Sequence, residues 1–298
     1  MRRIISLNRI SIRMLVVTKH TGQLCNQIWS LLPIIAYIEH TQSKACILNA
    51  RKDYVDLFPA LKGYKRISWI HLCGIDPGKI WRKITKIVEK RVRSFEGALG
   101  KGQSSGIRQI DGWDYRHDNS YIDEQKEQIL PLFEPRKEVR DRINDTLTPF
   151  DGITIGVHIR RGDYKDWCGG AYYYADDVYV RIMQELAAEA KKQGKKIRFL
   201  ICSNEPFNAK QTGLNSIRIP NADGITDLYG LASCDYIVGP PSSYSQWASF
   251  YGGVPLCLIL QKEQKVSLKD FTPIVHLDTF ADRKRLEMNK DERFVLIK

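Results

Sequence analysis

A group of charged side chains stands directly after a long apolar run in the middle of the chain. The stretch from Ile153 to Asp166 opens as an apolar run that predicts a buried strand, and it ends in His158, Arg160, Arg161, Asp163 and Tyr164. In open α/β sheets, ligands bind at the carboxyl ends of the strands. Two adjacent guanidinium groups at such a place suit an anion, above all a diphosphate, because each can donate parallel hydrogen bonds to its oxygens. We therefore expect an anion site here.

Polar side chains also follow two later predicted strands, at residues 197–202 and 236–238. Ser203 opens the loop SNEP after the first, and Ser242 and Ser243 lie in the loop GPPSSYSQW after the second, where a helix is predicted to begin. Hydroxyls and backbone N–H groups at a helix start can bind phosphate. Taken alone, either serine is more typical of an N-cap. If the strands are parallel, all three loops lie at one edge of the sheet.

Predicted strands and helices alternate along the chain, which indicates an α/β fold with parallel sheets. In the second half, strands are predicted from residue 153 and at residues 197–202, 216–219, 236–238 and 254–260, and helices at 175–193, 227–233 and 243–251. The first half offers strands at 14–17 and 45–48, a turn with Gly22, and helices ending near residue 40 and at 123–130 and 134–146. A Pro-Phe-Asp-Gly run at 149–152 breaks the pattern. We therefore expect two domains, at residues 1–150 and 151–298.

The composition is that of a globular protein with a strong basic bias. Of the 298 residues, 43% are hydrophobic and 27% charged, which excludes a disordered chain, and the net charge is +12. Such a charge suits nucleic acid, an anionic membrane or a negatively charged small substrate. A segment at residues 79–93, which begins with Lys79 and ends with Arg93, is rich in Lys and Arg and predicts a basic helix. Three readings stay open: a solvated surface helix, a helix resting on anionic lipid headgroups, or a nucleic-acid contact.

No signal sequence, membrane span or metal motif is recognisable. The basic start of the chain lacks a cleavage site, and no window of about 18 apolar residues occurs, so we expect a cytoplasmic protein that at most rests on a membrane surface. The seven cysteines are scattered singly, without CxxC, and are expected to be reduced core residues. Neither a DxD motif nor a cluster with metal-ligand spacing is present, so we expect no metal.

Three segments together resemble the fucosyltransferase superfamily, which includes the α-1,2-fucosyltransferases of glycosyltransferase family 11, the α-1,6-fucosyltransferases and the protein O-fucosyltransferases. HIRRGDY resembles its HxRRxD motif. DLYGLASCDYIVGPPSSYSQWASFYGG resembles its later block, and TGQLCNQIW resembles the GGLGNQ-type amino-terminal loop of the α-1,2 branch. The segments recur in the right order across roughly residues 15–260. The chain is most similar to the bacterial α-1,2 enzymes.

The resemblance implies the GT-B fold, in which two Rossmann-like domains face each other across a cleft. Residues 1–150 would form the acceptor side and residues 151–298 would hold GDP-fucose. The implied activity is transfer of L-fucose from GDP-fucose, with inversion and without a metal or other cofactor. The implied acceptor is a glycan hydroxyl, first of all the 2-OH of a terminal galactose in an oligosaccharide or a lipid-linked surface polysaccharide such as O-antigen. No nucleic-acid partner is expected.

The resemblance also assigns residues to GDP-fucose. Arg160 matches the motif arginine that contacts the diphosphate and stabilises the leaving group, and His158 and Arg161 match its neighbours. Asp227 matches the acidic residue that reads guanine, which is chemically sensible because guanine presents a pair of N–H donors that a carboxylate can accept. The remaining candidate ligands of GDP-fucose are Ser203, Ser242, Ser243 and, on the opposite side of the cleft, Asn26.

The chemistry of such a transfer needs a cation and a proton acceptor. Breaking the sugar–diphosphate bond leaves negative charge on the β-phosphate, and Arg160 with helix-start amides is our hypothesis for stabilising it. Asp163, Asp166 and Glu205 are the carboxylates near the motif loops, and the base stays unassigned among them. For Asp163, an ion pair that holds an arginine in place is favoured over a base role.

Departures from the α-1,2 pattern leave other functions open. GQLCNQ has fewer glycines than that branch, and GPPSSYSQW differs from its Asn-Ser-Thr-Phe-Ser-Trp-Trp wording, so the linkage could be α-1,6 or O-linked instead. A nucleic-acid-binding protein is a second class, supported by the charge. A third is a non-catalytic glycan-binding protein with exposed aromatic platforms at Tyr172, Tyr173, Tyr174 and Trp247.

Overall fold

The computed structural model describes residues 14–17, 22–48, 50–71, 107–110, 112–113 and 116–277. The chain divides into two compact units, Met1–Glu134 and Pro135–Lys298. The predicted basic helix at residues 79–93 and most of the Gly/Ser-rich stretch 97–112 lie outside the described residues.

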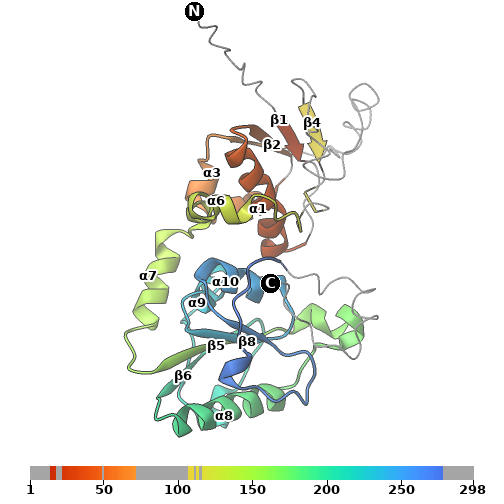
Figure 1. Cartoon of the computed structure of the whole chain (residues 1–298). Helices are drawn as coiled ribbons and strands as arrows, with labels where there is room; N and C mark the ends of the chain where they lie inside the picture. Colours follow the sequence, from red (N-terminus) through yellow and green to blue (C-terminus); the bar gives the residue numbers. More distant parts are fainter. Residues whose placement is uncertain are drawn as a thin grey trace, which may run out of the picture. The chain divides into compact units, whose positions relative to one another are not determined.

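The first unit is built on a parallel sheet with the strand order β3-β2-β1-β4, of which Figure 1 labels β1, β2 and β4. Its strands are β1 (Met14–Val17), β2 (Lys44–Leu48), β3 (Ile67–Ile70) and β4 (Ile107–Ile110). Met14 is in register with Lys44 on one side and with Ile107 on the other. The helices are α1 (Leu24–His40), α2 (Lys52–Val55), α3 (Pro59–Lys62), α6 (Ile122–Ile129) and the 3-10 turn η1 (Leu130–Phe133).

The central helix of this unit, α1, is apolar on nearly every side. Every residue from position 27 to position 38 is buried, as expected of a helix inside a core. Pro33 lies within it and removes one backbone donor without ending the helix, which confirms the predicted helix to residue 40. At its end, His40 stacks on Tyr121 with ring centroids 4.4 Å apart and contacts Glu124 of α6. Within the described part of the chain, no helix has both the length and the apolar character needed to span a membrane.

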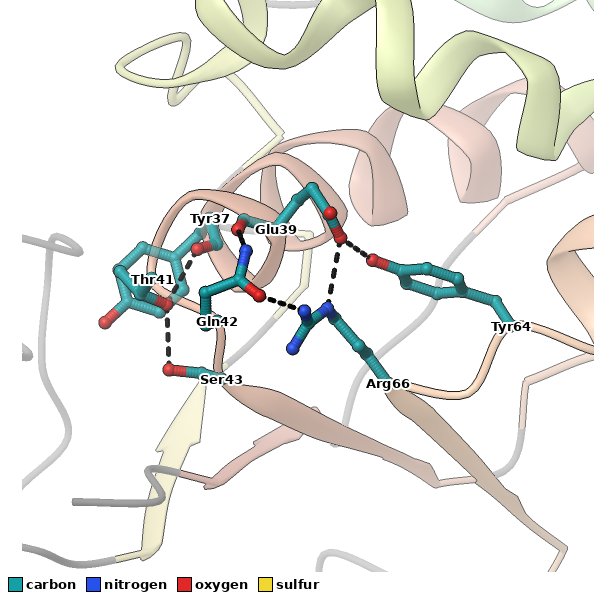
Figure 2. A network of polar contacts seen from close by, with 7 residues as sticks. All are labelled: Tyr37, Glu39, Thr41, Gln42, Ser43, Tyr64 and Arg66. Atoms are coloured by element: carbon teal, nitrogen blue, oxygen red, sulfur yellow. Dashed lines mark hydrogen bonds and ion pairs between the residues drawn. The ribbon is translucent and has the colours of Figure 1, made fainter. Parts of the chain in front are cut away.

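Polar side chains join the end of α1 to the segment that leads into β3 (Figure 2). The Glu39 carboxylate accepts hydrogen bonds from the Tyr64 hydroxyl and from Arg66 Nε, the second at 3.2 Å. Arg66 also donates to the side-chain oxygen of Gln42, whose amide donates to the Glu39 carbonyl at 2.6 Å. Burial and the Glu39 contact raise the pKa of the Tyr64 hydroxyl above its ordinary value, so it remains a donor. The network ties α1 to the edge of the sheet.

The second unit carries a five-stranded parallel sheet with the order β7-β6-β5-β8-β9. The strands are β5 (Ile153–Ile159), β6 (Ile197–Ser203), β7 (Ser216–Ile217), β8 (Tyr236–Gly239) and β9 (Leu256–Leu258). The helices are α7 (Lys137–Thr146), α8 (Asp176–Lys192), α9 (Gly224–Leu231) and α10 (Ser243–Gly252). Figure 1 shows α8 along one side of this sheet and α9 and α10 along the other. This confirms the predicted α/β fold with two parallel sheets.

Two glycines permit the close packing around β5. A Cβ on Gly156 would come within 2.6 Å of a methyl group of Leu231 in α9. A Cβ on Gly239 in β8 would lie 2.7 Å from the carbonyl oxygen of His158 and 2.8 Å from its Cβ. At Gly239 the contact is with backbone, so only a residue without a side chain fits, whereas at Gly156 the Leu231 side chain would have to shift; β5 therefore lies tightly against α9 and β8.

The boundary between the units comes earlier than the expected one near residue 150. Glu134 ends the first unit and Pro135 begins the second. The reason is α7, which the sequence analysis placed in the first domain but which packs against α9 of the second unit. Arg142 of α7 also donates to the carbonyl of Asn221, just before α9, at 3.1 Å.

Candidate functional site

Three loops lie together at one edge of the second sheet because β5, β6 and β8 are parallel. If the five strands are numbered as they occur along the chain, their order across the sheet is 3-2-1-4-5, which is the Rossmann order. The chain adds strands outward on one side of β5 and then, from β8 onward, on its other side, so the connections reverse direction between β5 and β8. Ligands of such sheets bind outside the carboxyl ends of the strands at this reversal. The loop after β5 carries Arg160, and the loop after β8 carries Ser242 and Ser243 at the start of α10. The two loops predicted to hold phosphate therefore flank the reversal point.

The adjacent arginines are engaged differently because side chains alternate across a strand. Ile155, Val157 and Ile159 belong to the core cluster that includes α8. Arg161 continues that alternation and forms an ion pair with Asp176, the first residue of α8. Burial acts to lower the pKa of Arg161, but the hydrogen bond and charge of Asp176 outweigh it and raise the pKa, so the guanidinium stays charged. Arg161 is thus held by the protein on the α8 side.

Arg160 follows the other set of positions, those of Gly156 and His158. Its Nη2 lies 2.7 Å from Asp163 Oδ1, and its guanidinium lies 5.4 Å from the centre of the Tyr164 ring. The Tyr164 hydroxyl in turn donates to the carbonyl of Pro241 at 2.6 Å. Tyr164 therefore connects Arg160 to the loop that precedes α10. This ion pair is the contact that the sequence analysis favoured for Asp163 over a base role, and its part in a reaction stays a prediction.

The backbone after β5 is fixed by two side chains that the sequence analysis did not assign to this task. Asn204 Oδ1 accepts a hydrogen bond from the Arg161 N–H at 3.0 Å, and Glu205 Oε1 accepts one from the Gly162 N–H at 2.9 Å. Gly162 has a φ of +63°, in the left-handed region that favours glycine. Ser203 donates to the carbonyl of Glu205 at 2.7 Å, so its hydroxyl shapes the turn that presents these side chains. The loop after β6 thus supports the loop after β5.

His158 is a buried, neutral residue beneath this loop. Its side chain is 5% exposed, and burial, followed by the nearby positive charge of Arg160, lowers its pKa to about 3. Its ring stacks on Tyr244 of α10, with centroids 4.9 Å apart and 28° between the planes. Among the described residues, its Nδ1 has no hydrogen-bond partner. A neutral, buried imidazole packs the floor of the site and is poorly suited to accept a proton from solvent.

The start of α10 is organised around Ser242. Ser242 is the N-cap, and its Oγ accepts a hydrogen bond from the Tyr244 N–H at 3.2 Å. The hydroxyl of Ser245 donates back to the Ser242 carbonyl at 3.3 Å. Ser242 thus acts as the N-cap that the sequence analysis weighed against phosphate binding, while Ser243 is the first residue of the helix. The positive end of the α10 dipole points to the same edge as Arg160.

Asp227 lies in the first turn of α9, not at its start as predicted. The helix begins three residues earlier because Asp223 caps it, accepting hydrogen bonds from the Thr226 N–H at 3.0 Å and from the Thr226 hydroxyl. Burial raises the pKa of Asp227 to about 6, although the Arg218 charge and a contact with Cys202 act to lower it. A partly desolvated carboxylate of this kind gains most from a ligand that supplies hydrogen-bond donors.

Asn26 belongs to the first unit, in the first turn of α1. The turn before it contains Gly22, with a φ of +77°, where a Cβ would come within 2.3 Å of Asn26 Nδ2. Gln27 donates to the Gly22 carbonyl at 3.3 Å, and Ser30 donates to the Asn26 carbonyl at 2.8 Å. Glycine is therefore required for this tight strand-to-helix turn, as in other α/β units that bring a backbone close to a ligand.

The prediction that four aromatic side chains form platforms for a sugar is wrong for three of them. Trp247 is 0% exposed, and Tyr172 and Tyr174 are also buried, with the Tyr174 hydroxyl donating to the Ile259 carbonyl at 3.0 Å. Tyr173 alone of the four is partly exposed, with the Lys165 ammonium 5.7 Å from its ring centre. These rings build the core because their side chains pack between α8 and the sheet or within α10.

The described cysteines are mostly core residues, and the described part of the chain shows no metal-binding group. Five of the described cysteines are buried, as predicted: Cys25, Cys46, Cys202, Cys234 and Cys257. Burial raises the pKa of the Cys202 and Cys234 thiols, so both stay protonated. In the part of the chain that the structure describes, no three His, Cys, Asp or Glu side chains come together as a metal site.

Comparisons with known proteins identify the fold. No protein-family model matches the chain. Nodulation protein Z of Bradyrhizobium diazoefficiens is 25% identical over 160 residues, which cover 43% of this chain and 43% of that protein, so the match spans less than half of the relative's length.

Two solved structures are similar over most of the chain. FUT1 of Arabidopsis thaliana in complex with GDP has a TM-score of 0.54 at 15% identity, covering 89% of this chain and 74% of its own. A NodZ alpha-1,6-fucosyltransferase soaked with GDP-fucose has a TM-score of 0.51 at 16% identity, covering 88% of this chain and 99% of its own. The chain therefore has an α/β fold with two parallel sheets that is similar to the fold of these two solved structures.

Proposed function

We propose that this protein is a fucosyltransferase that moves L-fucose from GDP-fucose to a hydroxyl of a glycan. The observation that carries the proposal is the grouping of Arg160, the start of α10 and Asp227 around the carboxyl edge of a sheet with Rossmann order. A cation, a helix start and a partly desolvated carboxylate suit a diphosphate and a guanine base. Solved structures with this fold were obtained with GDP and with GDP-fucose, which supports the same donor here.

In the proposed reaction, Arg160 stabilises the charge that develops on the β-phosphate as the bond to fucose breaks. Asp163 and Tyr164 hold the guanidinium, so little reorganisation accompanies the change in charge. Because Arg161 is paired with Asp176, it contributes mainly by fixing the loop. The amides at the start of α10, with Ser242 and Ser243, would bind the remaining phosphate oxygens. We keep Asn26 as a candidate contact from the first unit.

The proton of the acceptor hydroxyl must go to a base or to the departing phosphate. Two of the three candidate carboxylates are already engaged: Asp163 with Arg160, and Glu205 with the Gly162 N–H. Asp166 is exposed at the end of the same loop and is our first candidate. If Asp166→Asn leaves both the rate and its pH profile unchanged, the phosphate itself is the better proton acceptor.

For the linkage we propose α-1,2 transfer to a terminal galactose, on the resemblance of the three motif segments. Transfer with α-1,6 linkage is the second candidate, supported by the similarity to a NodZ alpha-1,6-fucosyltransferase. We place the reaction in the cytoplasm, on a lipid-linked or soluble oligosaccharide. The basic segment at residues 79–93 would attract such a protein to an anionic membrane surface. Co-sedimentation with vesicles that is insensitive to anionic lipid content would remove that part of the proposal.

The decisive experiment measures GDP release from GDP-fucose with a panel of galactosides and other oligosaccharides, and determines the linkage of each product by NMR. We expect acceptor-dependent GDP release that a chelator does not reduce. Loss of activity on chelation would refute a metal-independent mechanism. Absence of GDP binding together with salt-dependent binding of RNA or DNA would refute the enzyme and favour a nucleic-acid-binding protein.

A further inference from the structure

Tyr244, in the first turn of α10, contacts two other elements of the second unit. Its ring stacks on His158 at the end of β5, with centroids 4.9 Å apart. Its hydroxyl donates to the carbonyl of Gly224, the first residue of α9, at 2.6 Å. Its own N–H donates to Ser242 Oγ at 3.2 Å. One side chain therefore links the end of a strand to the starts of two helices.

Each of these three places leads to a different part of the proposed donor site. Asp227 follows Gly224 by three residues, so the carbonyl that Tyr244 contacts lies in the same first turn as the proposed guanine ligand. Ser243, beside Tyr244, opens the helix proposed to bind phosphate. His158 is two residues before Arg160. Tyr244 is thus placed to control the spacing between the groups that would bind the base and those that would bind the diphosphate.

Spacing matters for a nucleotide because its base and its diphosphate are joined by a ribose of fixed reach. A site whose two halves are held at the right separation binds both parts without paying the entropy of ordering each half separately. A hydroxyl-to-carbonyl hydrogen bond between the first turns of α9 and α10 acts on that separation directly. The stacked, buried His158 gives the Tyr244 ring a rigid support from which the hydroxyl reaches α9.

We infer that Tyr244 is a positioning residue that sets the distance between the base-binding turn of α9 and the phosphate-binding start of α10. The inference rests on the proposed function, since it takes Asp227 and α10 as the two halves of a GDP site. It goes beyond the proposed function by naming a residue that connects the two halves of the site, through the hydrogen bond from its hydroxyl to the Gly224 carbonyl. The contrasting possibility is that the hydroxyl only stabilises the fold.

The test compares whole and divided ligands on the Tyr244→Phe variant, which keeps the ring and removes the hydroxyl. Calorimetry would measure Kd for GDP, for guanosine and for pyrophosphate. We expect GDP to bind about five- to tenfold more weakly, the order of one hydrogen bond, while guanosine and pyrophosphate each change by less than about twofold. The matched control is Tyr251→Phe, in the last turn of α10, whose ring packs on Tyr229 of α9 at 4.8 Å. It should leave all three constants unchanged.

Three results would overturn the inference. Equal weakening of all three ligands, or of GDP together with only one of its fragments, would mean that Tyr244 supports the fold or one half of the site, not the spacing. An unchanged Kd for GDP would mean that the hydrogen bond has no role in binding. A comparable loss in Tyr251→Phe would mean that the weaker binding reflects a general change in the packing of α9 on α10 and is not specific to the Tyr244 hydroxyl. If the wild-type protein bound no GDP, the proposed function would be refuted as well, which separates that failure from the other three.

Discussion

Asp227 should make donor binding depend on pH in a range where few other groups change charge. Burial raises its pKa from 3.8 to about 6, so near pH 5 it is mostly protonated in the free protein. A protonated carboxyl has lost one acceptor and cannot accept both N–H donors of guanine. We therefore expect the affinity for GDP-fucose to fall as the pH drops through 6.

The size of the effect follows from the ionised fraction. With a pKa of about 6, roughly 97% of the carboxyl is ionised at pH 7.5 and roughly 9% at pH 5. If only the carboxylate form binds, the apparent Kd rises by the inverse of that fraction, which is about tenfold between the two conditions. His158, with a pKa of about 3, stays neutral over the whole interval and does not contribute.

The assay is a Kd for GDP-fucose between pH 5 and 8, without acceptor. GDP-fucose is preferred to GDP because both of its phosphates are esterified and do not titrate here. The control is Asp227→Asn, which should bind weakly at every pH and show no slope. A flat wild-type profile, or an equal slope in Asp227→Asn, would refute the assignment of Asp227 to guanine.

The same carboxyl should make the free protein less stable at neutral pH. A folded-state pKa above the unfolded value means that the native state binds the proton more tightly, so stability falls as the pH rises from about 4 to about 6 and then levels off. Asp227→Asn removes this penalty, which we expect to be about 1–3 kcal/mol. The variant should thus melt at a higher temperature than the wild type at pH 7.5 and at nearly the same temperature at pH 4. A lower melting temperature at pH 7.5 would contradict the role of burial.

The remaining predictions concern the edge of the second sheet. Arg160→Ala should lower kcat by roughly 10² to 10³ with little change in melting temperature, and near-normal turnover would exclude it as the stabiliser of the leaving group. Asp176→Asn should instead leave Arg161 partly buried and unpaired, so chemical denaturation should show a loss of about 1–3 kcal/mol before any specific effect on kcat. Gly239→Ala should destabilise by about 1–3 kcal/mol because its Cβ would meet backbone, and the control Gly224→Ala, which meets no atom within 4 Å, should be close to neutral.

Much of the scaffold could be predicted because its signals are local. The apolar run gave the start of β5 correctly, and the flanking charges of α8 gave bounds that agree with the structure within one residue. Alternation of strands and helices was sufficient to predict parallel sheets, and from them the common edge of three loops. The start of α9 was missed, although Asp223 followed by Thr226 is a capping pattern that could have been recognised. Strand β9 is shorter than predicted, because Leu260 turns away and donates to the Gln264 side chain at 2.8 Å.

The site depended on contacts that no local pattern contains. Asn204 and Glu205 lie more than forty positions after the backbone groups that they bind. Nothing in the tetrapeptide SNEP shows whether its side chains hold a neighbouring loop or contact a substrate. The aromatic residues were misassigned for a related reason. A tyrosine or tryptophan near a loop is equally compatible with a sugar platform and with a core, and only the packing of α8 and α10 decides between them.

The two arginines show where sequence and structure meet. Both follow the same strand, both are permanently charged, and composition alone cannot separate them. The alternation along β5 can, because residues 155, 157 and 159 are bulky and apolar whereas Gly156 and His158 occupy the other face. Extending this alternation places Arg161 with the bulky residues and Arg160 with His158, so the two guanidinium groups should point to opposite faces of the sheet.

The alternation of side chains does not say which face of the sheet carries the ligand. Two contacts support the face of Arg160: Arg161 is paired with Asp176 at the start of α8, and Arg160 lies against Tyr164, whose hydroxyl reaches the loop before α10. We therefore propose Arg160, which is itself paired with the exposed carboxylate of Asp163, as the arginine that contacts the ligand, and Arg161 as the one whose ion pair holds the loop.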